Sequence, residues 1–271
     1  MLTQTEFVNA YGNAGAKKAT SPAVRLFLLA MLAGFEIACG GALSTIASFS
    51  AGSVSIVKTL ASFTFPLALT MVIWTGAELF TGNCLITISV LDKKASVGGM
   101  LRNWCIVYVG NLAGSLILAF CLANFKQIGL GGGALATSII STAVNKCSYG
   151  FGDAFVRGIG CNILVCIAIM AATSAKDAIG KFISAVVPVA AFVMLGFEHS
   201  IANMYYIPTG LFAMTVPAYA EAANAAGLNT AALTWGAFFV KNLLPVTLGN
   251  IIGGAGFGAL MWYAHGDHGA K

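Results

Sequence analysis

The sequence predicts an all-α membrane protein with six transmembrane helices, arranged as two repeats of three. Three observations support this fold class: the composition, six long apolar stretches, and short motifs that recur at fixed offsets. Of the 271 residues, 58% are hydrophobic and only 8% are charged, whereas a soluble domain has about 25% charged residues. Mean hydropathy is +0.87. A soluble enzyme, a nucleic-acid-binding protein and a disordered chain are therefore excluded.

Six apolar stretches define the predicted spans, because a helix needs roughly 20 apolar residues to cross the hydrocarbon layer. They cover residues 25–49, 59–91, 103–125, 155–173, 182–219 and 235–263. The second and fifth are too long for one straight helix and contain polar residues midway, so both are predicted to be broken. The connection from 126 to 157 is predicted to be a flexible turn followed by a short helix. We treat residues 1–271 as one transmembrane domain.

Lys and Arg residues are distributed unequally between the two predicted faces of the membrane. Nine fall on the side of the termini and five on the other. The side richer in Lys and Arg is normally cytoplasmic, so both termini are predicted to be cytoplasmic in a cell membrane. The nine are Lys17, Lys18, Arg25, Lys93, Lys94, Arg102, Lys176, Lys181 and Lys271, and the five are Lys58, Lys126, Lys146, Arg157 and Lys241.

The remaining features of the composition give no sign of a metal site, a cofactor or a disulfide framework. The seven Cys are an odd number, and they form neither a CxxC pair nor a cluster with His. The first 22 residues lack the apolar core of a secretory signal. We expect a short cytoplasmic leader there, for which a helix is one option.

The interruptions of the two long stretches resemble each other. GAELFTGNC at 76–84 and GFEHSIANM at 196–204 both fit the pattern G-x-E-x-x-x-x-N, at an offset of 120 residues. The paired positions are Gly76, Glu78 and Asn83 with Gly196, Glu198 and Asn203. The third and sixth stretches also share N-x6-GN, at 103–111 and 242–250. Self-similarity of this kind indicates an internal repeat.

Residues 25–125 and 155–263 are therefore predicted to be the two repeats. Three spans in each half require the halves to cross the membrane in opposite directions, which makes the repeat inverted. Interrupted helices at matching positions of two such halves indicate a substrate path near the bilayer midplane. Non-helical backbone at that depth is tolerated only inside protein or along a cavity.

Four segments resemble the formate/nitrite transporter family, which also includes hydrosulfide channels. They are GAELFTGN, NWCIVYVGNLAGS, GFEHSIANMYYIP and NLLPVTLGNIIGG, and the similarity extends from about residue 25 to residue 263. The resemblance implies a homopentamer with one pore in each subunit and an aquaporin-like arrangement of the spans. It also implies passage of a small monovalent anion or its protonated acid. Formate is the leading substrate, with nitrite and hydrosulfide as alternatives.

The resemblance further implies which residues lie along the pore. His199 corresponds to the central pore histidine, and Thr81 to a residue of the broken loop in the second span. The other implied positions are Leu69, Leu79, Phe80 and Phe192 at two apolar constrictions, Lys146 near the extracellular mouth, and Asn162 and Asn250 lining or bracing the pore.

The chemistry of these residues supports a path for a weak acid. His199 is the only histidine in the predicted membrane region, where an ionisable side chain is costly and is a functional candidate. An anion loses far more solvation free energy in an apolar slit than a neutral acid does. We expect Lys146 to attract the anion, which is neutralised near the slit and passes beside His199 and Thr81. The proton comes either from His199 or from water.

The acidic residues of the two interruptions have a different predicted role. Glu78 and Glu198 are expected to accept hydrogen bonds from backbone that the helix breaks leave unpaired. Asn83 and Asn203 are expected to support the same loops. Glu198 could also influence the neighbouring imidazole of His199.

Two other classes of function are compatible with a membrane protein of this size. An aquaporin-type pore for neutral solutes shares the architecture, but both Asn-Pro-Ala signatures are absent from the sequence. An intramembrane protease is suggested by the adjacent His199 and Ser200, but the sequence contains no G-x-S-G motif. No P-loop occurs that would support a nucleotide-driven pump. The sequence therefore predicts a channel or secondary transporter and not an enzyme.

Overall fold

The computed structural model describes residues 1–267 and, within that range, consists of helices and turns without β-strands. Lys271, counted in the predicted orientation, lies outside the described residues. Six helices are long and apolar enough to cross a membrane. They cover Ala23–Ser48, Val54–Thr75, Val97–Asn124, Phe151–Ser174, Ala178–Leu195 and Ala237–His265. The predicted all-α fold with six spans is confirmed.

Both long stretches are broken where the sequence predicted. The segments are α3 (Val54–Thr64), α4 (Leu67–Thr75), α5 (Phe80–Asn83) and α6 (Ile86–Leu91) in the first, and α10 (Ala178–Leu195) and α11 (Ser200–Ala213) in the second. α4 ends at Gly76 and α10 at Gly196, with φ angles of 69° and 70°. Glycine adopts this left-handed conformation without a steric penalty. The glycine of each G-x-E motif therefore ends the helix.

Close helix pairs hold the bundle together. α2 (Ala23–Ser48) packs along α7 (Val97–Asn124), and α9 (Phe151–Ser174) packs along α13 (Leu244–His265). Where α2 crosses α7, Gly114 lies directly against the backbone of Met31. In the other pair, Gly249 lies against the carbonyl of Phe155. Small residues permit this close approach between helix backbones. The van der Waals contacts that result drive helix association in lipid, where no hydrophobic effect acts between the helices.

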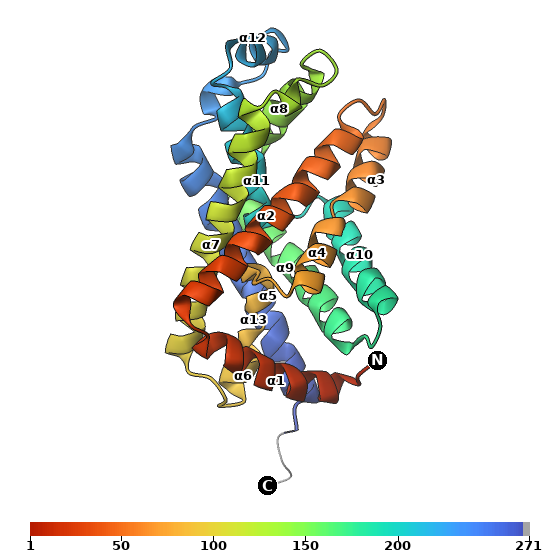
Figure 1. The fold of residues 1–271 in the computed structure, drawn as a ribbon, viewed down its shortest axis with the longest axis vertical. Coiled ribbons are helices and arrows are strands. Elements are labelled where there is room, and N and C mark those ends of the chain that lie inside the picture. Colours follow the sequence, from red (N-terminus) through yellow and green to blue (C-terminus); the bar gives the residue numbers. More distant parts are fainter. Residues whose placement is uncertain (268–271) are drawn as a thin grey trace.

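The N-terminal segment is an integral part of the core, which the sequence analysis did not predict. α1 (Gln4–Thr20) begins with a capping box between Thr3 and Glu6. It lies across one end of the bundle beside α6 (Figure 1). Phe7 and Tyr11 are buried, and the Tyr11 hydroxyl donates to the carbonyl oxygen of Gly82 at 3.0 Å. The segment is amphipathic, so hydropathy alone did not identify its buried face.

The connection between the third and fourth spans also differs from its prediction. After a 3₁₀ turn, η1 (Gln127–Gly129), the glycines at 131–133 all have positive φ. The helix that follows, α8 (Ala134–Ser148), has 15 residues. Its apolar side, including Leu135 and Ile140, is fully buried, and it packs against α11. The predicted turn is present, but the helix is longer than expected and belongs to the core.

The last part of the described chain begins with two short elements, α12 (Pro217–Ala225) and the 3₁₀ turn η2 (Thr230–Ala232). α12 lies at the same end of the molecule as α8 (Figure 1). The sixth span starts with a π-helical segment, η3 (Ala237–Leu243), before α13. Pro245 lacks the N–H that a regular helix needs and its ring crowds the preceding turn, which favours wider turns at this point.

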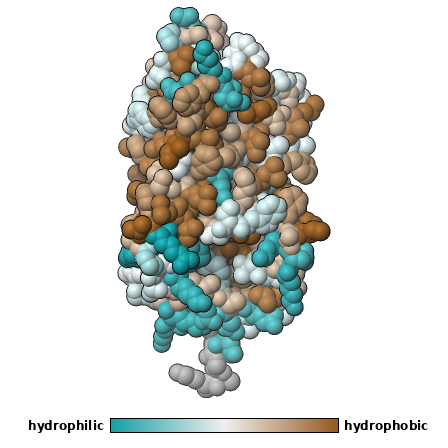
Figure 2. All heavy atoms as spheres, in the orientation of Figure 1, coloured by the Kyte–Doolittle hydropathy of each residue, from teal (hydrophilic) through white to brown (hydrophobic). Residues whose placement is uncertain are grey.

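The surface agrees with a protein that sits in a bilayer. In Figure 2 apolar side chains dominate the middle of the visible face, and hydrophilic side chains gather at the two ends. The start of α1 and the end of α13 lie at the same end of the molecule (Figure 1), as an even number of spans requires. That this end faces the cytoplasm stays a prediction.

Candidate functional site

Among the cavities of the described residues, two reach the broken helices, one beside α8 and one beside α1. The α8 vestibule has a volume of about 440 Å³, and its lining includes Lys58, Lys146, Arg157, Phe192 and His199. The α1 vestibule has a volume of about 370 Å³, and its lining includes Tyr11, Lys18, Gly76, Leu79 and Lys181. The two cavities share no lining residue, so a layer of protein that contains the broken helices separates them.

His199 and Thr81 are joined within this separating layer. The imidazole Nε2 of His199 lies 2.9 Å from Oγ1 of Thr81. The other ring nitrogen, Nδ1, accepts a hydrogen bond from the backbone N–H of Ala202 at 3.0 Å, so that His199 caps α11. A nitrogen that accepts a backbone N–H has no proton of its own. The neutral ring therefore has its hydrogen on Nε2, donates it to Thr81, and leaves the Thr81 hydroxyl proton free.

The four apolar positions expected at constrictions occupy different places. Phe192 lines the α8 vestibule, with its ring stacked on that of His199 at a centroid distance of 6.0 Å. Leu79 lines the α1 vestibule. Leu69 is buried and lines neither cavity. Phe80 also lines neither, and its ring packs against Tyr108 at 4.9 Å. Phe192 and Leu79 thus lie on opposite sides of the separating layer.

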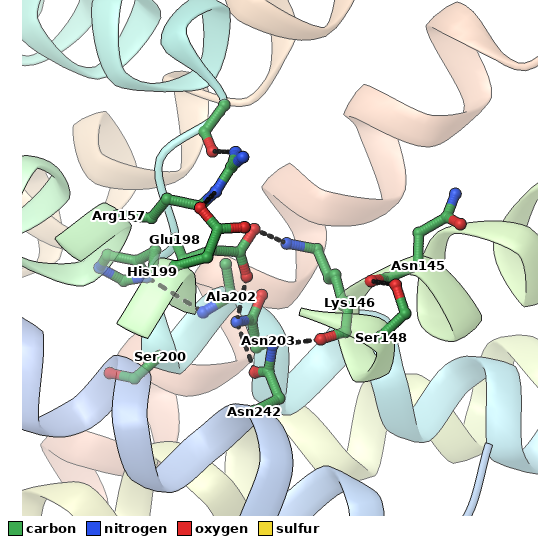
Figure 3. A network of polar contacts seen from close by, with 12 residues as sticks. Asn145, Lys146, Ser148, Arg157, Glu198, His199, Ser200, Ala202, Asn203 and Asn242 are labelled. Carbon is green, nitrogen blue, oxygen red and sulfur yellow. Dashed lines mark hydrogen bonds and ion pairs between the residues drawn. The ribbon is translucent and has the colours of Figure 1, made fainter. Parts of the chain in front are cut away.

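At the α8 vestibule, Lys146 belongs to a four-residue polar cluster (Figure 3). Its Nζ lies 2.7 Å from Oε1 of Glu198. The other carboxylate oxygen accepts from Asn203 at 2.7 Å, and the same amide group donates to Asn242 at 2.7 Å. Asn242 in turn donates to the backbone carbonyl of Lys146 at 2.8 Å. The π-helical start of the sixth span contains Asn242, so this unusual segment takes part in the cluster.

At the α1 vestibule the same four residue types make corresponding contacts, and Lys18 Nζ in addition donates to Oδ1 of Asn83 at 3.2 Å. Lys18 Nζ lies 2.8 Å from Oε2 of Glu78, and Asn83 donates to that oxygen at 2.7 Å and to Asn103 at 2.9 Å. Asn103 donates to the backbone carbonyl of Lys18 at 3.0 Å. Glu78 and Glu198 therefore accept hydrogen bonds from asparagine side chains and ion-pair with lysines, rather than accepting from freed backbone.

The sequence predicts Lys18 only as one of the cations on the side of the termini, not as the counterpart of Lys146. The reason is its spacing: Lys18 and Lys146 differ by 128 positions (146 − 18), whereas Glu78 and Glu198 differ by 120 (198 − 78). A search at one fixed offset therefore pairs the glutamates and misses the lysines. The contacts, in contrast, pair all four residue types.

One asparagine from the third span of each half holds each broken loop. Asn250 accepts from the backbone N–H of Ser200 at 2.9 Å and donates to the carbonyls of Gly158 at 2.8 Å and Glu198 at 3.0 Å. Asn111 makes the equivalent three bonds to Phe80, Ala30 and Glu78. Asn162 donates to the carbonyls of Thr81 at 3.2 Å and Asn250 at 2.7 Å. All three side chains are fully buried and line neither cavity, so their contacts are those of braces.

The arrangement does not form a nucleophilic or metal centre within residues 1–267. The hydroxyl of Ser200 has no hydrogen-bond partner there, and both nitrogens of His199 are already engaged by Thr81 and Ala202. No group of three or more His, Cys, Asp or Glu residues is placed to bind a metal ion in the described range. The site is a pair of charged cavities on either side of a hydrogen-bonded imidazole.

Comparison with known proteins places this geometry in a family. The model of the formate/nitrite transporter family matches residues 5–264. A probable formate transporter of Methanothermobacter thermautotrophicus is 38% identical, with 92% of this chain and 91% of that protein covered. The formate channel FocA of Haemophilus influenzae is 34% identical, with 94% and 91% covered.

Solved structures agree with the sequence comparison. A structure described as a pentameric formate channel with formate bound superposes with a TM-score of 0.80 at 37% identity, covering 92% of this chain and 97% of that one. An ion channel of the same family superposes with a TM-score of 0.79 at 28% identity, covering 96% and 99%. The family consists of transporters and channels rather than enzymes, as the sequence predicted. The chain belongs to the formate/nitrite transporter family.

Proposed function

We propose that the protein conducts the small monovalent anion of a weak acid, and that formate is its substrate. The observation that supports this most directly is the buried His199–Thr81 pair between two cavities that each contain lysines. Family membership and relatives named as formate transporters or channels favour formate over nitrite and hydrosulfide.

The proposed path begins in a vestibule and crosses the apolar layer in the neutral form. Transfer of a bare carboxylate past Phe192 and Leu79 would remove its hydration without an opposite charge to replace it. The Thr81 hydroxyl has a free hydrogen that can be donated to the permeating anion. Because His199 donates Nε2–H to Thr81, it strengthens that hydroxyl as a donor. Protonation of the anion in this layer by a proton from water completes the proposal. His199 keeps its single Nε2 hydrogen, because its loss would leave an imidazolate, and acts by orienting and polarising the Thr81 hydroxyl.

The proposed assembly is based on a solved relative, and the proposed orientation on the distribution of Lys and Arg. We propose a homopentamer in the cell membrane with one pore per subunit, because a pentameric channel superposes on nearly the whole chain. The exposed apolar residues along α3 and α10, which include Phe63 and Val187, then face lipid or neighbouring subunits. Both termini are proposed to be cytoplasmic from the excess of Lys and Arg on their side. The two halves are proposed to be inverted repeats, which the matched clusters around Glu78 and Glu198 support.

Uptake of radiolabelled formate, nitrite and sulfide into proteoliposomes between pH 4 and pH 9 tests the function. We expect formate flux well above that of protein-free liposomes, rising as the external pH falls and the acid becomes more available. Faster nitrite or sulfide flux would transfer the proposal to that anion. Swelling in water or glycerol without any anion flux would instead indicate the aquaporin-type alternative and overturn it.

A further inference from the structure

Each vestibule contains a second lysine, and these two lysines differ from Lys18 and Lys146 in having no partner. Lys58 lines the α8 vestibule and Lys181 lines the α1 vestibule. Within residues 1–267, neither Nζ has a hydrogen bond or an ion pair. Both residues are only partly exposed. They are therefore cavity-lining cations that form no ion pair within residues 1–267.

Lys146 and Lys18, the other lysines of the two vestibules, are held in ion pairs. Lys146 lies 2.7 Å from Glu198, with side-chain exposures of 15% and 3%. Lys18 lies 2.8 Å from Glu78. Arg157, the third cation of the α8 vestibule, is 2.7 Å from Asp153 and also donates to the Gly196 carbonyl. A close ion pair produces little potential at a distance, because the fields of its two charges largely cancel.

The formal charge of each cavity then depends on the cations that are not held in its buried ion pair. In the α8 vestibule, Lys146 offsets Glu198, which leaves the charges of Lys58 and of Arg157, whose partner Asp153 is exposed and does not line the cavity. In the α1 vestibule, Lys18 offsets Glu78, which leaves the charge of Lys181. From this balance we infer that Lys58 and Lys181 recruit the anion at the two mouths. The buried ion pairs position the broken loops behind them.

The surroundings of Lys58 explain how an anion would be bound there. A Cβ placed on Gly196 would lie 3.4 Å from both Lys58 Nζ and the Arg157 guanidinium, so the two cations converge over that glycine. The charges that act on Lys58 are Lys146, Arg157 and Glu198. Two like charges held this close favour a small anion between them. Lys58 and Arg157 thus form an anion site at the mouth, ahead of Phe192 and His199.

A purely structural role for Lys58 makes a different prediction. Gly196 ends α10, and a cation near a helix C-terminus stabilises the helix through its dipole. If that were its only role, loss of the charge would lower thermal stability and leave anion flux unchanged per folded channel. A role in recruitment instead makes flux depend on charge and on ionic strength.

The inference rests on the proposed anion conduction and is tested in the same proteoliposomes. The variants are Lys58→Gln and Lys181→Gln, with Lys58→Arg as the conservative change. Lys126→Gln and Lys93→Gln are matched controls, because both lysines are exposed and line neither vestibule. At low ionic strength and low formate we expect each vestibule variant to reduce the initial rate about 3- to 10-fold, since a focused potential raises the local anion concentration. The controls and Lys58→Arg should retain the wild-type rate.

Salt provides an internal check on the electrostatic origin. In about 1 M salt the Debye length falls to about 3 Å, so the vestibule variants should converge with the wild type. A rate deficit that persists unchanged in high salt would indicate a structural role and overturn the inference.

Chemical restoration of the charge gives a second readout. In Lys58→Cys, a methanethiosulfonate reagent forms a mixed disulfide with the thiol and releases a sulfinate. A trimethylammonium-bearing reagent should restore the rate, and a sulfonate-bearing reagent should lower it further. Wild-type protein treated with each reagent controls for the seven native cysteines. Equal effects of the two reagents would overturn the inference.

The outcomes separate this inference from the proposed function. Formate flux in the wild type together with unchanged rates in both lysine variants would refute recruitment and leave formate conduction standing. If nitrite or sulfide proves to be the conducted anion, the same comparison applies with that anion. Absence of any anion flux would overturn both proposals.

Discussion

The side chains of Thr81 and His199 are 118 positions apart in the chain and 2.9 Å apart in space. Each comes from the first residues after a helix break, one in each half of the molecule. Their hydrogen bond therefore connects the two broken loops directly. A change at either residue alters both the donor presented to a permeating anion and the contact between the halves.

Replacement of Thr81 by Val separates the hydroxyl from the shape of the side chain. We expect at least a 10-fold loss of formate flux at neutral pH, because the donor disappears and the Nε2–H of His199 is left without an acceptor, at a cost of about 1–3 kcal/mol. Thr81→Ser keeps the hydroxyl and should retain most of the flux. Initial uptake rates in proteoliposomes measure both. Equal rates for Thr81→Val and wild type would refute the role of the hydroxyl.

Replacement of His199 by Phe tests the imidazole. The aromatic ring keeps the stacking on Phe192 but loses the bonds to Thr81 and to the Ala202 N–H. We expect the flux to fall and its dependence on pH to change, measured as uptake between pH 4 and pH 9. Flux that matched the wild type at every pH would contradict the proposed pathway.

The buried ion pair of Lys146 and Glu198 predicts an asymmetry between single and double changes. Lys146→Met leaves a buried carboxylate without its cation, which typically destabilises a protein by about 3–5 kcal/mol. The double variant Lys146→Met with Glu198→Gln removes both charges and should recover part of that loss. Thermal unfolding in detergent measures the difference. A double variant as unstable as the sum of the singles would exclude the coupling.

Replacement of Asn250 by Ala should lower the stability of the protein although no charge is removed. Asn250→Ala removes three buried hydrogen bonds, two to the helix break after Gly196 and one to α9, each worth about 1 kcal/mol with a further penalty for unpaired groups. We expect a loss of about 3 kcal/mol or more, measured by thermal unfolding. Asn124→Ala is the control, because Asn124 is exposed and bonds only within its own helix.

The ion pair between Lys18 of α1 and Glu78 leads to a further prediction about stability. Lys18→Met leaves Glu78 paired only with Asn83, and the Lys18 side chain is 27% exposed. We expect a smaller destabilisation than for Lys146→Met, about 1–3 kcal/mol. Lys17→Met is the matched control on the same helix, since Lys17 has no ion pair in the described range. Thermal unfolding of both variants under one set of conditions checks the order.

Hydropathy and motif spacing were sufficient to predict the spans and both helix breaks. Bilayer thickness fixes the length of a span, and the G-x-E motif marks the position of each break. Hydropathy and spacing were insufficient for α1 and α8, whose apolar faces are short and alternate with polar residues. The sequence did not identify Lys18 as the counterpart of Lys146, because the offset between the two lysines differs from the offset between the two glutamates. Asn103 and Asn242 stood out as a repeated motif, but their contacts with Asn83 and Asn203 depend on how α7 and the sixth span approach the loops, which no local pattern encodes.

The saturated hydrogen bonding of His199 also bears on inhibition by transition metals. An imidazole binds zinc, nickel or copper through a nitrogen lone pair. Here the lone pair of Nδ1 points at the Ala202 N–H, and Nε2 bears a hydrogen held by Thr81. A metal ion in the α8 vestibule thus finds no ligand at the ring unless α11 first loses its cap. Such ions should be poor blockers of this pore, even though a histidine lines its wall.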